Sequence, residues 1–305
     1  MDRRIKFRQV EAFVEIARQG SFKAAAEALG LTQPAISKIL RDLEDIMGAA
    51  LMERGRGGVT LTAEGEVFLA AAEASLGALR QGFDGVARLG SGAAGRIAVG
   101  ALPSVAARVL PKAALGFQVL APEITLSLQE GPHGYLMDRL RGGALELVVG
   151  RMGPAETMRG ITFTQLYSER VAFVVRKGHP LSGQGSLAAL RDYPAIYPED
   201  EAAIRPLVAR LFISRGMAIL PRRIETVSGA FGRAMCLMSD AVWIISEGVV
   251  AGDIAAGRLE ILPIDAELTA GPIGVMARAS EAPSGPARLF RRSLGEAVEA
   301  LGLSA

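Results

Sequence analysis

Four polar side chains between residues 33 and 41 have types and a spacing that suit one chemical task. Gln33, Ser37, Lys38 and Arg41 fall on the side of a helical pattern that the apolar residues leave free. An amide suits the edge of adenine, lysine and arginine suit guanine or phosphate, and a serine hydroxyl pairs with several base edges. We therefore expect this face to contact DNA. The full set of candidate DNA-contacting residues is Ser21, Thr32, Gln33, Pro34, Ala35, Ser37, Lys38, Arg41, Arg54 and Arg56.

Three short helices are needed to hold that face, and the sequence predicts all three. Apolar residues recur at three- and four-residue intervals from Phe7, and Gly20 ends this first helix. Ser21 is the expected N-cap of a second helix over residues 22–29, and Thr32 is the expected N-cap of the third. Two such helices joined by a turn form a helix-turn-helix, whose second helix enters the major groove. The expected buried stripe of the third helix is Ile36, Ile39, Leu40, Leu43, Ile46 and Met47.

A β-hairpin is expected after the three helices. Strand-like residues 50–53 and 59–61 flank a glycine-rich tip, where Arg54 and Arg56 are placed for contact with the phosphate backbone. Net charge does not decide the partner, because residues 1–56 hold ten basic and eight acidic side chains. The alternative is a winged helix that docks onto another protein, and we favour DNA.

A long helix is expected from residue 62 to about residue 89. Thr62, with Glu64 and Glu66 close behind, marks its beginning, because hydroxyl and carboxylate groups favour the first turn of a helix. One interpretation packs this helix on its own domain. We favour a helix that pairs two chains, because its apolar seam is narrow. That seam is Leu69, Ala72, Leu76, Leu79, Phe83 and Val86.

Strand-like and helix-like segments alternate beyond a small-residue linker at residues 91–95. This alternation predicts an α/β domain on largely parallel strands, and about 210 residues are enough for two lobes. The run from Gly90 to Gly95 spells G-x-G-x-x-G, but a helix precedes it and a strand follows, the reverse of a dinucleotide site. The strand-like segments are 97–100, 124–129, 146–150, 170–175, 195–197, 241–245 and 273–277, and the helical ones are 105–120 and 135–141.

Composition narrows the function classes. The chain has 305 residues, half of them hydrophobic, and a formal net charge of +2, which suggests about two globular domains. One cysteine, Cys236, and two histidines, His133 and His179, exclude an internal disulfide and a cysteine or histidine-rich metal site. We expect no cofactor and, since no catalytic grouping stands out by spacing, no enzyme. No export signal or membrane-length apolar stretch stands out, so we expect a cytoplasmic protein that spans no membrane.

The N-terminal motifs are those of one protein family. They resemble the DNA-binding domain of LysR-type transcriptional regulators, although Met52 stands where the family usually has an aromatic side chain. The opening residues 5–8, the run 22–29 and residues 226–231 look similar to regulators of protocatechuate catabolism and to galactose-binding-protein regulators. The matching residues are Ser21-Phe-Lys-Ala-Ala-Ala-Glu-Ala-Leu29, Thr32-Gln-Pro-Ala-Ile-Ser37, Ile39, Leu43, Glu44, Gly48, Leu51, Arg54, Val59-Thr-Leu-Thr62 and Gly65.

The resemblance implies an α+β multidomain chain: a winged helix-turn-helix, a dimerisation helix and a two-lobed α/β effector domain similar to type 2 periplasmic binding proteins. It also implies a homodimer, a tetramer of two dimers, an operator that is a broken palindrome, RNA polymerase as a partner at activated promoters, and a small-molecule effector. The expected domains are 1–61 for DNA binding, 62–90 for the linker helix and 91–305 for the effector, with lobe I over about 91–162 and 268–305 and lobe II over about 163–267.

Effector candidates follow from where the expected strands end, because open α/β sheets bind ligands there. Ser104 and Val105 begin a helix after the first strand, where backbone N–H groups suit a carboxylate. Arg151 directly follows a strand and suits a bidentate carboxylate contact, the alternative being a surface salt bridge. Relatives that respond to muconate-like acids use an arginine at the matching place. His133 either lines the cleft or caps a helix. The full set of candidates is Ser104, Val105, His133, Arg151, Pro198, Glu199, Thr226, Ser228 and Phe231.

The expected function is control of a catabolic operon by an aromatic-derived carboxylic acid, with a sugar as the alternative effector. Two other classes are a winged-helix protein without a DNA partner and a periplasmic solute receptor, which shares the two lobes but needs an export signal. We expect His179 to hold a loop and Cys236 to be a small buried apolar side chain, with redox sensing as the alternative.

Overall fold

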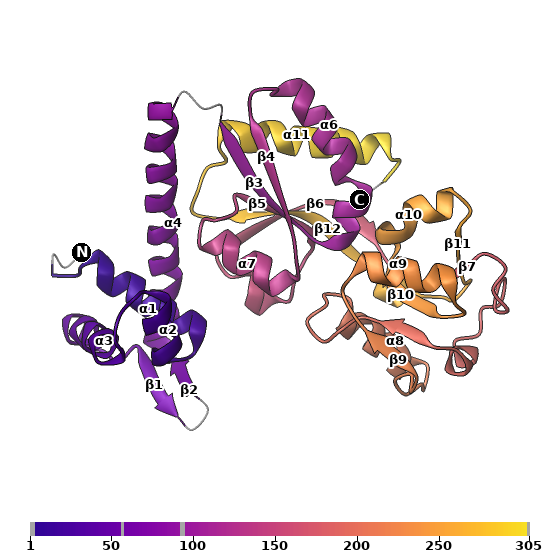
Figure 1. Ribbon diagram of the computed structural model, residues 1–305, viewed down its shortest axis with the longest axis horizontal. Helices are drawn as coiled ribbons and strands as arrows, with labels where there is room; N and C mark the ends of the chain where they lie inside the picture. The colour runs from indigo at the N-terminus through magenta and orange to yellow at the C-terminus, as the bar shows by residue number, and fades with distance from the viewer. Residues whose placement is uncertain (1–3, 56–57, 92–94, 304–305) are drawn as a thin grey trace. The chain divides into compact units, whose positions relative to one another are not determined.

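The computed structural model describes residues 4–55, 58–91 and 95–303 of the chain (Figure 1). It divides into two compact units, Met1–Ala93 with Arg141–Ala144, and the remainder. Each unit is described by itself. Arg56 and residues 92–94 of the expected linker lie outside the described residues.

Three short helices form the core of the first unit, as the sequence predicts. Gly20, with a positive φ of 58°, ends the first helix, where a left-handed backbone favours glycine. The hydroxyl of Ser21 accepts the N–H of Ala24, and that of Thr32 accepts the N–H of Ala35, so both expected N-caps are confirmed. The helices are α1 (Phe7–Gln19), α2 (Phe22–Ala28) and α3 (Gln33–Met47).

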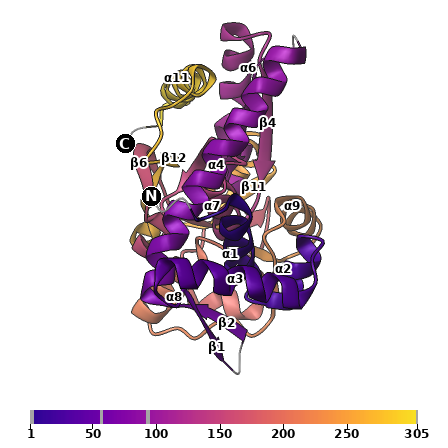
Figure 2. The ribbon, with the colours of Figure 1, turned by 90° about the vertical axis from the view of Figure 1, so that its left-hand side faces the viewer.

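The expected hairpin is present as β1 (Met52–Gly55) and β2 (Gly58–Leu61), paired antiparallel with Met52 opposite Leu61. It is tied to the helices through the backbone of Gly20, whose carbonyl accepts the N–H of Val59 at 3.0 Å. Figure 2 shows the helices and the hairpin together at one end of α4 (Ala63–Ser91).

The long helix α4 begins as expected, since the Thr62 hydroxyl accepts the N–H of Gly65 at 2.9 Å. Its apolar seam is divided between two environments. Ala72 and Leu76 are buried in the same core as α1 and α3, whereas Leu79 and Phe83 are 47% and 72% exposed. The buried half agrees with the alternative that the helix packs on its own domain. The exposed half leaves an apolar surface for another chain.

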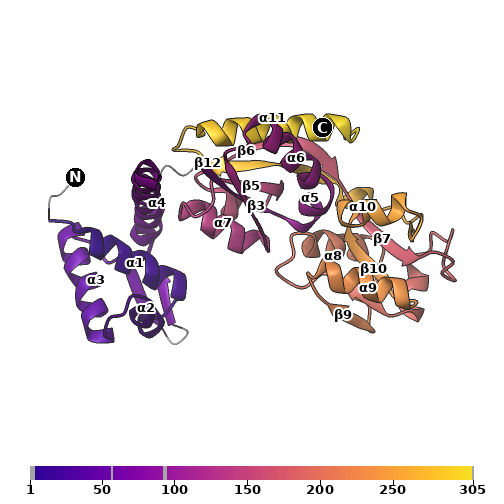
Figure 3. The same cartoon turned by 45° about the horizontal axis from the view of Figure 1, so that its top comes forward.

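The first lobe of the second unit is a five-stranded sheet covered on both faces. Figure 3 shows α6 and α11 on one face and α7 on the other. Phe117 of α6 and Phe290 of α11 meet edge to face, 5.5 Å between ring centroids, in the larger core. The strands, in spatial order, are β4 (Thr125–Glu130), β3 (Arg96–Ala101), β5 (Leu147–Arg151), β12 (Gly271–Arg278) and β6 (Ile161–Glu169). The helices are α5 (Pro103–Arg108), α6 (Leu110–Leu120), α7 (His133–Arg141), the 3₁₀ turn η1 (Ala155–Met158) and α11 (Gly285–Ala300).

The second lobe has the same plan. Phe173 and Phe212 stack on one face of its sheet, and Cys236 and Trp243 pack on the other. The strands, in spatial order, are β11 (Leu259–Ile261), β7 (Val171–Arg176), β10 (Val242–Ser246), β8 (Ala195–Tyr197) and β9 (Arg223–Glu225). The helices are α8 (Arg205–Ser214), α9 (Gly229–Met238) and α10 (Glu247–Ala255), with 3₁₀ turns η2 (Ala188–Asp192) and η3 (Glu267–Thr269).

Two expectations about these lobes are wrong. The sheets are mixed rather than largely parallel, because β12 runs antiparallel to both its neighbours and β7 does the same in the other lobe. The expected start of lobe II at residue 163 falls inside β6, which pairs with β12 along its whole length. The chain therefore leaves the first sheet after Glu169. In the described ranges, no helix has both the length and the apolar character needed to cross a membrane.

Candidate functional site

The N-terminal half of α3 presents the expected polar face. Thr32, Gln33, Pro34, Lys38 and Arg41 are exposed, while Ala35 and Ser37 are half-buried beside the core residues Ile36 and Leu40. The expected stripe is wrong at its last residue, since Met47 is 39% exposed at the end of the helix. A face with an amide, an ammonium and a guanidinium at a helix N-terminus suits hydrogen bonds to base edges and phosphates.

A hollow of about 540 Å³ lies between this face and the hairpin. Within it the Arg41 side chain bends back, so that Nε donates to the carbonyl of Ser37 at 3.2 Å. Arg41 as a residue is exposed. The hollow is lined by Phe22, Gln33, Pro34, Ser37, Leu40, Arg41, Glu44 and Met52.

The structure gives less support to the other candidate DNA-contacting residues, Ser21, Arg54 and Arg56. The Ser21 hydroxyl caps α2 and is half-buried. The backbone of Arg54 lies in β1 opposite Val59, near the tip of the hairpin. The role of Arg54 therefore stays a prediction, as does that of Arg56, which lies outside the described residues.

A cavity of about 280 Å³ lies between the two lobes of the second unit, and it collects six of the nine effector candidates. These six are Ser104, His133, Arg151, Pro198, Thr226 and Ser228. The other three do not line it. Val105 is fully buried in the core of the first lobe, Glu199 is half-buried beside the cavity wall, and Phe231 is 44% exposed. The backbone N–H of Phe231 donates to the hydroxyl of the lining residue Ser228 at 3.2 Å.

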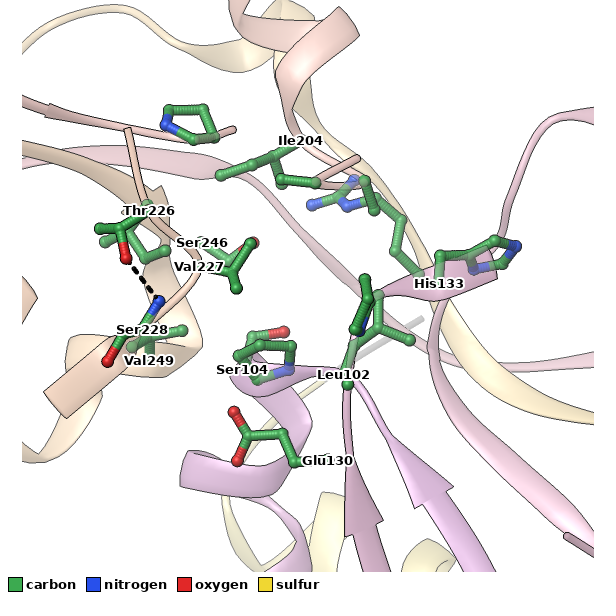
Figure 4. A pocket seen from close by; sticks show the side chains of 18 residues that line it. Leu102, Ser104, Glu130, His133, Ile204, Thr226, Val227, Ser228, Ser246 and Val249 are labelled. Atoms are coloured by element: carbon green, nitrogen blue, oxygen red, sulfur yellow. Dashed lines mark hydrogen bonds between the residues drawn. The ribbon is translucent and has the colours of Figure 1, made fainter. Parts of the chain in front are cut away.

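One wall of the cavity carries hydroxyl groups on the second lobe (Figure 4). The Thr226 hydroxyl accepts the backbone N–H of Ser228 at 3.0 Å, which orders the turn into α9. Ser246, at the end of β10, adds a third hydroxyl. Hydroxyl hydrogens rotate to suit their partner, so this wall can donate to a carboxylate or accept from an alcohol.

Arg151 lies inside the molecule rather than in a surface salt bridge, so that alternative is wrong. It is 5% exposed, and its guanidinium donates from Nη2 to the carbonyl of Glu169 at 2.8 Å and from Nη1 to that of Thr269 at 3.3 Å. Nε has no hydrogen-bond partner in the described part of the chain. Burial lowers the pKa of Arg151, and the nearby Glu169 raises it again. A buried cation whose Nε–H has no partner in the described residues thus lines the cavity.

Glu169 is the acidic residue whose charge acts on Arg151. It is 5% exposed, and its carboxylate accepts the backbone N–H of Gly248 at 3.0 Å. Burial raises the pKa of Glu169, while a hydrogen bond with Ser104 and the charges of Arg151 and Arg108 lower it. No local sequence signal pointed to Glu169, because its partners are distant along the chain.

His133 begins α7 and belongs to the rim of the cavity. Its ring is buried, with Nε2 3.2 Å from the Thr157 hydroxyl, and in Figure 4 it points away from Thr226 and Ser228. Gly153 packs directly on the ring, since a Cβ there would lie 2.2 Å from Nε2. The histidine therefore packs the first lobe more than it faces a ligand.

Most of the apolar wall was missed by sequence reasoning. It comes from the ends of several strands and the starts of the following helices, which only the fold brings together. Val227 belongs to the segment 226–231 that the sequence placed at this wall. The missed lining residues, Glu130 and Ser246 being the polar ones, are Leu102, Pro103, Glu130, Gly131, Pro132, Ala202, Ala203, Ile204, Ile245, Ser246 and Val249.

His179 and Cys236 stay outside the site. Nδ1 of His179 accepts the N–H of Leu181 at 3.0 Å, and its ring packs on Tyr193, as a loop-holding residue does. Cys236 is fully buried, and burial raises the pKa of its thiol to about 12, which disfavours the reactive thiolate. No group of metal-ligating side chains gathers anywhere in the described residues.

Both units match known families. Residues 7–66 match the family described as "Bacterial regulatory helix-turn-helix protein, lysR family", and residues 90–299 match "LysR substrate binding domain". The HTH-type transcriptional regulator PcaQ of Agrobacterium fabrum is 46% identical over 300 residues, which cover 98% of this chain and 96% of that protein. The uncharacterized HTH-type transcriptional regulator YdcI of Escherichia coli is 32% identical over 276 residues, 90% of each chain.

Solved structures share the fold. Full-length BenM matches with a TM-score of 0.57 at 21% identity, over 98% of this chain and 99% of that one. Full-length CbnR in complex with its target DNA matches with a TM-score of 0.54 at 23% identity, over 96% of this chain and all of that one.

Proposed function

The chain belongs to the LysR family of DNA-binding transcriptional regulators, and from that premise we propose that α3 and the hairpin contact the operator while the inter-lobe cavity binds a small carboxylic acid. The resemblance of residues 5–8, 22–29 and 226–231 to regulators of protocatechuate catabolism supports control of a catabolic operon by an acid. The identity of 46% to the transcriptional regulator PcaQ over nearly the whole chain supports the role in transcription. The regulator acts on chromosomal DNA in the cytoplasm, and at activated promoters it works with RNA polymerase.

On DNA the protein acts as a homodimer, two of which form a tetramer. Two recognition helices reach half-sites about one helical turn apart or a multiple of it, so the operator is a broken palindrome. The exposed apolar half of α4 supports the dimer, because Leu79 and Phe83 leave large apolar side chains uncovered on a helix of 29 residues.

The observation that carries the effector proposal is the composition of the cavity wall. Arg151 is the one cation among the described residues that line it, and it is buried next to a wall of hydroxyl groups. Leu102, Ile204 and Val249 make much of the remaining wall apolar. About 280 Å³ is at the lower end of small-molecule pockets, which hold a compact ligand. An acid with a flat apolar body fits this chemistry better than a sugar, whose many hydroxyls need more polar partners.

A thermal-shift panel tests the effector class. The purified full-length protein is mixed with protocatechuate, a carboxymuconate, a muconate or a sugar. A ligand that binds only the folded state at 100 times its Kd stabilises it by about 2.7 kcal/mol, so the acid that binds raises the Tm. Thr226→Val should reduce that shift, because it removes a lining hydroxyl. Thr162→Val, which removes a hydroxyl on β6 that bonds the carbonyl of Ala277, is the matched control. The proposal is contradicted if only sugars raise the Tm, or if no acid in the panel raises it.

Two substitutions test the DNA-contacting face. Gln33→Ala should relax the preference among operator sequences, because it removes a base contact. Arg54→Ala should weaken binding to all sequences and flatten the dependence of affinity on salt, because it removes a phosphate contact. If both variants keep wild-type affinity and specificity, the assignment of this face is wrong.

A further inference from the structure

The side chain of Arg151 holds both places where the chain passes between the two lobes. The first passage follows Glu169, the last residue of β6, and the second precedes Gly271, the first residue of β12. Nη2 of Arg151 donates to the carbonyl of Glu169 at 2.8 Å, and Nη1 donates to that of Thr269 at 3.3 Å. One buried guanidinium thus joins two connections that are 100 residues apart in sequence.

Thr269 joins the same two connections a second time. Its hydroxyl accepts the backbone N–H of Val171, at the start of β7, at 2.9 Å and donates to the carbonyl of Ala266 at 2.6 Å. The residue is fully buried. Gly271 packs against the guanidinium, since a Cβ there would lie 2.5 Å from Nη1 of Arg151. The connections therefore cannot shift relative to each other without moving Arg151 or breaking one of these hydrogen bonds.

The network reaches the cavity and the second lobe through Glu169. Its carboxylate accepts the N–H of Gly248 in α10, and Ser104 of α5 lies close enough to lower the pKa of this carboxyl. The backbone of Gly248 is close-packed there, because a Cβ would lie 2.4 Å from Glu169 Oε1 and 3.0 Å from the Ser104 carbonyl. Ser104 and Arg151 both line the cavity, so the groups that fix the connections also form its wall.

We propose that Arg151 is a positioning residue that fixes the angle between the two lobes by holding both connections, and that an acid in the cavity changes this angle through Arg151 and Ser104. The second half of the proposal rests on the proposed effector function, and the first half does not. Lysine cannot replace arginine here, since a single ammonium lacks the planar fork that reaches two carbonyls.

The angle is measured as a distance between spin labels in the full-length protein. Exposed Glu123 in the first lobe and exposed Lys177 in the second are changed to cysteine, while the native Cys236 is fully buried and stays unlabelled. Labelled chains are diluted into unlabelled ones, so that only distances within one chain are read. The probe added to test coupling is protocatechuate or whichever panel acid raises the Tm.

We expect a single narrow distance distribution without acid. Arg151→Lys and Thr269→Val should broaden it at least twofold in width or split it, because each removes a link between the connections. Thr269→Ser keeps the hydroxyl and should restore the wild-type distribution, and Thr162→Val, in the same sheet but remote from both connections, should leave it unchanged. A merely destabilised protein would lower its Tm without changing this distance.

The outcomes separate the two proposals. If Arg151→Lys and Thr269→Val both fold and keep the wild-type distribution, Arg151 does not fix the angle. If an acid raises the Tm but leaves the wild-type distribution unmoved, the coupling is wrong while the effector proposal stands. If no acid binds, the effector proposal and the coupling fail together, and the acid-free distributions still decide whether Arg151 holds the lobes.

Discussion

The carboxylate of Glu44, in α3, accepts the backbone N–H of Leu51 at 2.8 Å, just before the first strand of the hairpin. The same oxygen accepts the N–H of Met52 at 3.2 Å. One side chain of α3 thus accepts hydrogen bonds from two backbone N–H groups at the start of the β1–β2 hairpin, which is the wing of the winged helix. By charge alone Glu44 opposes DNA binding, but its contacts show that it fixes the wing relative to the helix.

Glu44→Ala should therefore weaken DNA binding although it removes a negative charge. Two backbone donors lose their partner, which costs about 1–3 kcal/mol of folding free energy when such groups are buried. With the wing displaced, we expect operator affinity to fall roughly tenfold, or about 1.4 kcal/mol. The slope of affinity against salt should stay unchanged, because Glu44 neutralises no phosphate. Fluorescence anisotropy of a labelled operator at several salt concentrations measures both quantities.

Asp45→Ala is the matched control for that prediction. Asp45 is the exposed neighbour of Glu44 on the same helix. Removing its charge should leave operator binding unchanged or slightly tighter. Glu44→Gln, whose amide oxygen still accepts an N–H, should recover most of the lost affinity. If Glu44→Ala binds as tightly as Asp45→Ala, the contact to Leu51 does not position the wing.

Glu169 should make the stability of the effector domain fall as the pH rises. Burial raises the pKa of Glu169 in the folded state, against the lowering effects of Ser104, Arg151, Gly248 and Arg108. A group with a raised folded-state pKa contributes its stability fully below its ordinary pKa and loses it as the pH rises through the folded-state value. Glu169→Gln keeps an oxygen for the Gly248 N–H and has no such titration. We expect the Tm of the wild type to fall relative to Glu169→Gln as the pH rises from about 4.5 upward.

Parallel pH series of Tm for the two proteins check this prediction. Any pH dependence that both share comes from other groups and cancels in the difference. A difference between the two Tm values that stays constant from acid to neutral pH would show that Glu169 does not titrate abnormally.

The N-terminal helices were predictable because their signals are local. Ser21 and Thr32 cap helices through atoms three residues away, and Gly20 needs only its own positive φ. The mixed sheets were not predictable in this way. The strand β6 holds exposed and half-buried residues along most of its length, so it lacks the continuous apolar run that identified β5 and β7.

The inter-lobe cavity was predictable in position, but the contacts of its lining residues were not. A residue at the end of a parallel strand was expected to face the cleft, and Arg151 does line the inter-lobe cavity. Its hydrogen-bond partner Thr269 is 118 residues away in sequence, and no local pattern predicts a contact between residues so far apart. Ser104 and Val105 are neighbours in one helix, where successive side chains point about 100° apart. One of them therefore faces the cavity and the other the core, and the sequence did not distinguish them.

Asp253 should protect the second lobe against acid. Its carboxylate accepts two hydrogen bonds from Arg233 at 2.8 Å and one from Arg258 at 2.7 Å, which joins α9 to α10. The hydrogen bond from Arg233 is the largest effect that lowers the pKa of Asp253, and Arg258 adds to it. A lowered folded-state pKa contributes stability above the ordinary carboxyl pKa and loses it as the pH falls through the folded-state value.

Asp253→Asn should thus have a lower Tm than the wild type at pH 7, and the two values should converge as the pH falls below about 4. We expect a smaller loss than for a fully buried ion pair, because Arg233 and Arg258 remain 44% and 50% exposed. Differential scanning calorimetry over this range provides the measurement. An equal deficit at every pH would mean that the asparagine perturbs packing instead of removing a charge pair.

The two halves of the α4 seam should respond differently to substitution. Leu76 is 5% exposed in the core with α1, whereas Phe83 is 72% exposed further along the helix. Leu76→Ala should lower the free energy of unfolding by about 2–5 kcal/mol, as for other core leucines, because it leaves a cavity. Phe83→Glu should leave the fold of each chain intact and dissociate the dimer, because it places a charge in an apolar interface.

Sedimentation equilibrium and thermal unfolding of the same samples separate these effects. The expected pattern is a destabilised dimer for Leu76→Ala and a monomer with native-like circular dichroism for Phe83→Glu. On the proposed operator with two half-sites, the monomeric variant should also lose affinity for the full operator while keeping its weak binding to a single half-site. If Phe83→Glu sediments as the wild type does, the exposed half of α4 is not the surface that pairs two chains.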